Sequence, residues 1–174
     1  NKSIRWFSEK IDKSKNFGGK IYNPLGKTSR QKIVRELMPH IRGLISKDEF
    51  KIGHFNDSDE VLEFVNSSRL KELGPLGTSC PDHFLRTKIR PLILDAIDED
   101  NLNNVIKELP NQLEDYKKYY ISYYERCKYS DSPKVRDPYP VVYLIPGIGM
   151  ITFAKDKPTA RISSEFYVNA INVM

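Results

Sequence analysis

Two long segments of the chain carry apolar residues at every third or fourth position, a spacing typical of amphipathic helices that bury one face. One helix is predicted over residues 29–46 and the longest one over about 101–128. Each contains a proline, Pro39 and Pro110, which should kink the first helix and kink or break the second. The apolar stripes predict that both helices cover a buried layer.

Capping residues mark where helices should begin. Thr28 or Ser29 can cap the first long helix, and a capping box from Asp57 to Glu60 introduces a shorter one. Asp156 precedes the last helical segment, which runs to the end of the chain. A further helical spacing near the start of the chain indicates the tail of a preceding helix.

Between these helices lie short apolar segments that predict strands. Residues 49–55 alternate between apolar and polar positions, whereas 89–95 and 141–145 are nearly unbroken apolar segments. The tight turn at 146–149 leads into 150–154, so the last two strands should form a hairpin. The order of elements predicts an α/β fold with a mixed sheet that carries helices on both faces.

The 174 residues fit one α/β domain over 28–174, preceded by a connecting segment over 1–27. Hydrophobic residues make up 39% and charged residues 29%, which is typical of a globular protein. The net charge of +5 comes from scattered basic residues rather than one patch, so no nucleic-acid partner is expected. No apolar segment approaches the length of about 20 residues that spans a bilayer, so no membrane partner is expected either.

The two cysteines, Cys80 and Cys127, form no Cys-x-x-Cys pair, which favours a reducing, cytoplasmic setting. The chain begins at Asn1 rather than Met, and it ends at Met174 inside a helical pattern. Both ends therefore predict that the sequence is one segment of a longer polypeptide.

The candidate site is a polar stretch before the 89–95 strand, where Cys80, Asp82, His83, Arg86 and Lys88 crowd into nine residues. Cys80, Asp82 and His83 could begin a metal site, but zinc needs at least three protein ligands and no partnering motif supplies the rest. Cysteine–histidine catalysis would need a third group to orient the imidazole. A purely structural loop, anion binding by Arg86 and Lys88, and contact with a neighbouring domain are the other interpretations.

If the strand pattern already holds at Arg86 and Lys88, their spacing of two places both cations on one side. Because the next segment is apolar, this loop should lie at the rim of the sheet, where open α/β sheets bind ligands. Two cations there favour an anionic group, either a substrate phosphate or a carboxylate of a neighbouring domain.

Two other motifs have simpler explanations. Pro146-Gly147-Ile148-Gly149 leads into a strand rather than a helix, so it predicts a hairpin turn and not a dinucleotide loop. Tyr124 and Lys128 have the spacing of a short-chain dehydrogenase pair, but no glycine-rich loop accompanies them. We interpret that spacing as a coincidence on a helix crowded with tyrosines.

Several segments together resemble the middle region of long bifunctional proteins that join a class II aldolase/adducin-type domain to a C-terminal short-chain dehydrogenase. This family is identified as rhamnulose-1-phosphate aldolase with alcohol or lactaldehyde dehydrogenase. The resemblance lies in Gly77-Thr78-Ser79-Cys80-Pro81-Asp82-His83 with Arg86-Thr87-Lys88, in Leu144-Ile145-Pro146-Gly147-Ile148-Gly149-Met150, in Phe17-Gly18-Gly19-Lys20 and in Val61-Leu62-Glu63-Phe64-Val65-Asn66.

The resemblance implies a class II aldolase-like or Rossmann-like sheet and a cytoplasmic role in rhamnose and other carbohydrate metabolism, with lyase and oxidoreductase activities. It carries over Cys80, Pro81, Asp82, His83, Arg86 and Lys88 without giving any of them a catalytic role. The family's His-x-His zinc motif and glycine-rich NAD loop are absent from this sequence. Zinc and NAD are therefore expected only in other parts of the polypeptide, with no cofactor and no metal in this segment.

The resemblance thus implies a connecting domain without a complete active site, inactive when isolated. Its expected partners are other domains of the same polypeptide, a further copy in a homo-oligomer, and a phosphorylated sugar. The alternative is a non-catalytic interaction or scaffolding module that holds domains or subunits together.

Overall fold

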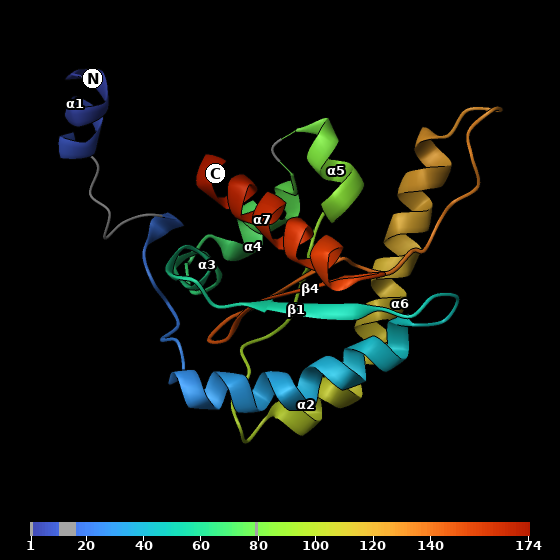
Figure 1. Cartoon of the computed structure of the whole chain (residues 1–174), viewed down its shortest axis with the longest axis horizontal. Helices are drawn as coiled ribbons and strands as arrows, with labels where there is room; N and C mark the ends of the chain where they lie inside the picture. The colour runs from blue at the N-terminus through green and yellow to red at the C-terminus, as the bar shows by residue number, and fades with distance from the viewer. Residues whose placement is uncertain (1, 11–16, 79) are drawn as a thin grey trace.

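A four-stranded mixed sheet forms the centre of the protein, and helices cover both of its faces (Figure 1). The structure is a computed structural model that describes residues 2–10, 17–78 and 80–174. Its elements in chain order are α1 (Lys2–Lys10), α2 (Lys27–Ile45), β1 (Ile52–Asn56), α3 (Asp59–Val65), α4 (Leu70–Leu73), the 3-10 helix η2 (Gly74–Leu76), α5 (Pro81–Thr87), β2 (Leu92–Ile93), α6 (Leu102–Cys127), β3 (Val142–Ile145), β4 (Gly149–Ala154) and α7 (Lys157–Val173). The predicted α/β fold with a mixed sheet is confirmed.

The strand order is β1-β4-β3-β2. The predicted hairpin is present, with β3 and β4 antiparallel and Tyr143 opposite Ile151. β1 adds to the outer side of β4 in the antiparallel sense, whereas β2 lies parallel to β3, with Leu92 opposite Tyr143. β1 and β2 are therefore the two edges of the sheet.

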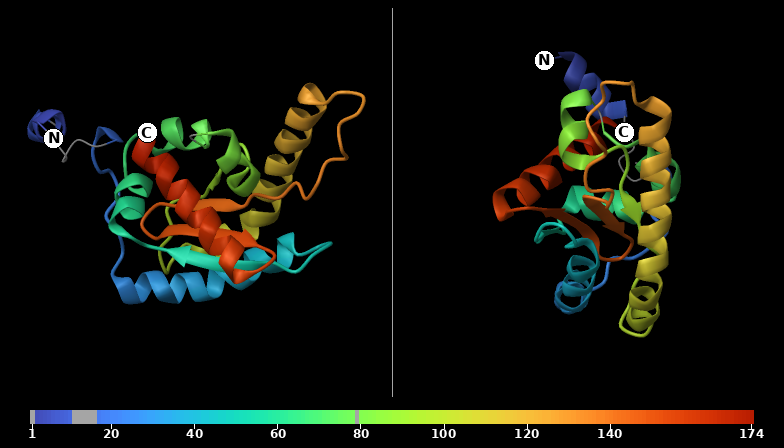
Figure 2. Two further views of the ribbon diagram at one scale, coloured as in Figure 1. Left: turned by 45° about the horizontal axis from the view of Figure 1, so that its top comes forward. Right: turned by 90° about the vertical axis from the view of Figure 1, so that its right-hand side faces the viewer.

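Successive side chains of the hairpin point to opposite faces of the sheet, as the period of two in a strand requires. Tyr143 and Ile151 pack in one core cluster with the apolar stripes of α2 and α6. Leu144 and Met150 pack in a second cluster with α3, α4 and α7. Figure 2 shows α7 on one side of the sheet and α2 with α6 on the other. All four residues of β3 are buried, which confirms the predicted central strand.

The hairpin turn is held by a buried asparagine from another element. Gly147 has a φ of +81°, a conformation that favours glycine, and its N–H donates to Asn66 Oδ1 over 2.7 Å. The carbonyl of Gly147 accepts from the N–H of Leu25 at 2.9 Å. The turn predicted at 146–149 is thus confirmed, and it is tied to α3 and to the segment before α2.

Two of the predicted helix caps are wrong. α2 begins at Lys27 after Gly26, without a side-chain cap, and Ser29 instead donates to a carboxylate oxygen of Glu99. Asp57 does not cap α3 but forms an ion pair of 2.8 Å with Arg30. In both cases a charged or polar partner from a distant element replaces the local bond that the sequence suggested.

The cap of the last helix is confirmed, since Asp156 accepts from the N–H of Thr159 over 2.8 Å. Both internal prolines lie within continuous helices, so the proposed break at Pro110 is wrong. The early helical spacing is confirmed over Lys2–Lys10, and Ile11 lies outside the described residues.

The first two strands are shorter than predicted. β1 covers Ile52–Asn56, and Phe50, expected on the strand, is 88% exposed. The strand predicted over 89–95 is reduced to Leu92–Ile93, with one further bond from the N–H of Leu94 to the carbonyl of Leu144. Pro91 has no N–H to donate, which limits pairing at that edge. Among the described residues, no helix is both long and apolar enough to cross a membrane.

Candidate functional site

The polar stretch that the sequence singles out is a short helix rather than a loop. α5 covers Pro81–Thr87, with Cys80 at the N-cap position. Proline suits the first turn because its ring holds φ near the helical value and its missing N–H would have no partner there. The hydroxyl of Thr87 donates to the carbonyl of His83 in the last turn. The expectation of a strand-like pattern at Arg86 and Lys88 is therefore wrong.

α5 lies against α7. The imidazole of His83 stacks on the ring of Phe166, with centroids 4.5 Å apart and planes 11° from parallel. The hydroxyl of Ser163 donates to the carbonyl of Arg86 over 3.0 Å. Asp82 and the side chain of Arg86 are exposed. The structure thus places His83 at a packing contact and leaves two charged groups toward solvent.

Lys88 points away from Arg86, because it follows the helix with a φ of +60°. Its ammonium donates to the backbone carbonyls of Asp137 and Tyr139 and lies 4.7 Å from the ring centroid of Tyr120. Burial lowers the pKa of Lys88 to about 8; the carboxylate of Asp137 opposes this shift and the charge of Lys51 adds to it. Lys88 is committed to holding the segment before β3.

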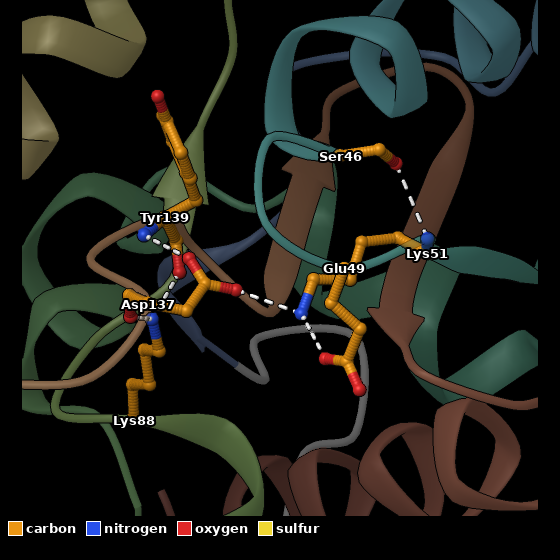
Figure 3. A network of polar contacts seen from close by, with 6 residues as sticks. All are labelled: Ser46, Glu49, Lys51, Lys88, Asp137 and Tyr139. Atoms are coloured by element: carbon orange, nitrogen blue, oxygen red, sulfur yellow. Dashed lines mark hydrogen bonds and ion pairs between the residues drawn. The ribbon is translucent and has the colours of Figure 1, made fainter.

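Asp137 links Lys88 to a second lysine (Figure 3). Its carboxylate accepts from the N–H of Tyr139 and pairs with Lys51 Nζ, both over 2.9 Å. Lys51 Nζ also pairs with Glu49 at 2.9 Å, and its side chain is only 12% exposed. Burial works against the charge of Lys51, but bonds to the two carboxylates outweigh it and raise its pKa. We call these contacts the Lys51–Asp137–Lys88 network.

A cavity of about 130 Å³ adjoins this network, next to the amino end of β3. Its apolar wall comes from α2, β4 and the segment before β3, and its polar groups include Lys51, Arg86 and Asp137. The lining residues are Ile45, Lys51, Leu85, Arg86, Asp137, Pro140, Val141, Phe153, Ala154, Thr159 and Ser163. The cavity has room for a few waters or one small charged group.

Sequence reasoning found Arg86 and Lys88 but missed Lys51 and Asp137. These two residues lie 86 positions apart in the chain and in segments without a motif, and their ion pair exists only in the folded protein. The exposed position of Asp82 and the stacking of His83 place them outside the cavity lining. Cys80 instead lines a separate open hollow with Phe84 and Tyr123.

The three histidines lie on separate elements. His40 on α2 donates from Nδ1 to the carbonyl of Glu36 over 2.8 Å. His54 lies on β1, where burial, followed by the charges of Lys157 and Arg161, lowers its pKa. Within the described ranges, no three His, Cys, Asp or Glu side chains gather in a way that could hold a metal ion.

Residues 32–174 match the family described as "Aldolase class II, second domain". The chain belongs to this family. Over 171 residues, 98% of its length, it is 34% identical to the protein named "Uncharacterized oxidoreductase YuxG" of Bacillus subtilis (strain 168). The chain spans only 25% of that relative's length. No solved structure matches the chain. The class II aldolase part of the predicted resemblance is thus confirmed.

Proposed function

We propose that the chain is the connecting domain of a sugar-metabolising polypeptide that combines class II aldolase and short-chain dehydrogenase activities. The observation that carries this proposal is a domain of an aldolase family that is similar to one quarter of a protein named an oxidoreductase. A lyase-type domain within an oxidoreductase is what a bifunctional chain requires. The expected reactions are cleavage of rhamnulose 1-phosphate and NAD-dependent oxidation of lactaldehyde in the cytoplasm. Zinc and NAD belong to other parts of that polypeptide.

In this proposal the domain shapes a site and does not complete one. The hydrogen-bond and ion-pair partners of its buried charged groups support that role. The ammonium of Lys88 donates to two backbone carbonyls, and the carboxylate of Asp137 is used by Lys51 and by the N–H of Tyr139. Groups with such partners hold three chain segments together and are not free to exchange protons with a substrate.

Arg86 is the cation of the predicted site that remains available for a ligand. Its side chain is exposed and lines the cavity beside Lys51. A guanidinium binds a phosphate or carboxylate through two parallel hydrogen bonds. We propose that Arg86 binds the phosphate of a phosphorylated sugar. A carboxylate of a neighbouring domain is the alternative ligand.

The test compares the full natural polypeptide with the chain of residues 1–174. The full polypeptide should cleave rhamnulose 1-phosphate and reduce NAD with lactaldehyde, whereas the isolated chain, folded by circular dichroism, should do neither. Turnover of either substrate by the isolated chain would contradict the connecting role. A full polypeptide with neither activity would contradict the bifunctional assignment.

A scaffolding module is the second candidate, and two exposed apolar side chains favour it. Leu85 on the cavity rim is 80% exposed, and Phe50, next to Lys51, is 88% exposed. In a scaffold, Leu85→Ser with Phe50→Ser should dissociate subunits or domains in analytical ultracentrifugation. In the connecting domain we favour, the same change should alter the activity of the full polypeptide as well as its assembly.

A further inference from the structure

The outer edge of β1 is an unpaired strand edge beside an apolar groove. β1 pairs only with β4 among the described strands. The groove has a volume of about 390 Å³ and lies between this strand and α2, which runs alongside it in Figure 1. Its lining is mostly apolar and consists of Val34, Arg35, Met38, Pro39, Arg42, Ile52 and Gly53.

The hydrogen-bonding register shows which backbone groups face outward. The N–H of Phe153 in β4 donates to Val141 over 2.9 Å, so the backbone of Phe153 faces the β3 side. Because antiparallel strands alternate, Thr152 and Ala154 face β1, and the backbone groups of Gly53 and Phe55 face away from the sheet. The carbonyl of Gly53 accepts from Lys157 Nζ at 3.1 Å, which agrees with this direction.

The helix beside the groove also offers a backbone acceptor. Pro39 lies inside α2 and has no N–H, so the carbonyl of Arg35, four residues earlier, lacks its usual helical donor. Met38 and Gly53 meet at the base of the groove, where a side chain on Gly53 would come within 2.5 Å of the Met38 sulfur. A chain lying in the groove would thus find an apolar base and backbone hydrogen-bonding groups.

Cations flank this edge on both sides. Arg35 and Arg42 are two turns apart on α2, about 10.5 Å along its axis, and Met38 lies between them. In the described part of the chain neither guanidinium has an ion-pair partner. Lys157 of α7 approaches the edge from the opposite side. Two copies of β1 paired edge to edge would bring these cations together, so charge disfavours a second copy as the occupant.

We propose that the groove between α2 and the outer edge of β1 binds an extended acidic segment of a partner protein, which joins the sheet as a fifth strand. The N–H of Gly53 and the outward groups of Phe55 form the ladder, since the carbonyl of Gly53 already accepts from Lys157. On the side of the segment that faces α2, an apolar side chain lies over Met38. Acidic side chains on the same side of the segment, two residues before and after it, meet Arg35 and Arg42. This is recognition by strand addition, in which the backbone gives affinity and the side chains give specificity. The proposal does not depend on the aldolase–dehydrogenase assignment.

The test uses a fluorescent peptide of about eight residues in which glutamate and valine alternate along one side of the strand and serine occupies the other side. It should bind in anisotropy titrations and slow amide exchange at Gly53 and Phe55. A matched valine–lysine peptide should not bind, nor should the valine–glutamate peptide N-methylated at every second residue. The Arg35→Ala/Arg42→Ala protein should bind about tenfold more weakly, since two charged contacts are lost.

The control protein, Lys118→Ala/Lys128→Ala, also loses two positive charges, but from exposed positions on and after α6. It should bind the peptide like the wild type. Circular dichroism of both double variants checks that the fold is intact. Absence of binding up to about 1 mM, equal binding of the lysine peptide, or unchanged binding of the N-methylated peptide would overturn the proposal. So would a dimer that protects the β1 amides by itself, because the occupant would then be a second copy.

Discussion

The β3–β4 hairpin has the structure that its sequence pattern predicts, whereas the α5–Lys88 region does not. The hairpin was predicted from an unbroken apolar run and a glycine turn, and both are present. The α5 region was predicted as a loop entering a strand. It is a helix followed by Lys88, whose side chain bonds to a segment 49 positions away. An apolar pattern predicts a helix or strand because the residues that form its buried face lie within that one element. The partner of a charged side chain instead depends on which elements pack together in the fold.

The largest expected effect lies in the hairpin. Leu144→Ala should reduce the free energy of unfolding by roughly 2–5 kcal/mol, because the side chain is fully buried and its loss leaves a cavity between β3 and α7. Chemical denaturation measures the change. A shift within about 0.5 kcal/mol, the range of surface substitutions, would contradict the central position of β3.

In the α5 region, Lys88→Met should reduce the free energy of unfolding by about 1–3 kcal/mol, because it leaves the carbonyls of Asp137 and Tyr139 without a donor. Denaturation of this variant is compared with Lys118→Met, an exposed position on α6. Equal stabilities of the two variants would show that the Lys51–Asp137–Lys88 network does not hold the segment before β3.

The wild type and Lys88→Met should also differ in how their stability depends on pH. The folded protein holds the pKa of Lys88 at about 8, below the ordinary 10.5, so between these values the unfolded chain binds more protons. Wild-type stability should therefore rise with pH across this window relative to Lys88→Met, in which the group is missing. The neutral amine keeps two N–H groups, enough for the two carbonyls. Parallel stability curves for the two proteins from pH 8 to 10.5 would contradict the burial of this ammonium.

A smaller effect is expected at the start of α7, the helix that covers the hairpin. Asp156→Ala removes the acceptor for the N–H of Thr159 and should cost about 1 kcal/mol, as lost caps do. The thermal midpoint should fall, while Asp131→Ala in the exposed turn after α6 should leave it unchanged. An unchanged midpoint in Asp156→Ala would show that the first turn of α7 is held by packing alone.

The smallest effect on stability is expected at Arg86. Because its side chain is exposed, Arg86→Ala should change the free energy of unfolding by less than about 0.5 kcal/mol. In the full polypeptide the same change should raise the KM for a phosphorylated sugar or loosen domain contact. A stable variant with unchanged KM and assembly would remove Arg86 from the proposed site, and an unfolded variant would make its role structural.

Most of the helices and strands can be predicted from the sequence alone. The stripe of Ile33, Leu37 and Ile41, the apolar strand at 142–145 and the cap at Asp156 each predict an element from residues within that element. Burial of one face and one capping bond are decided over a few residues, so the pattern is readable without knowing the fold. The charge composition also showed no single basic cluster, although it did not place Arg35 and Arg42 beside a strand edge.

Tertiary structure alone decided the polar partners and the length of the edge strands. Asp57 could have capped α3, but Arg30 lies within 2.8 Å in the fold and offers a charged partner. Lys88 could have joined Arg86, but its positive φ turns it toward Asp137. A charged side chain takes the strongest partner within a few ångströms, and which groups come that close depends on how the helices and strands pack together.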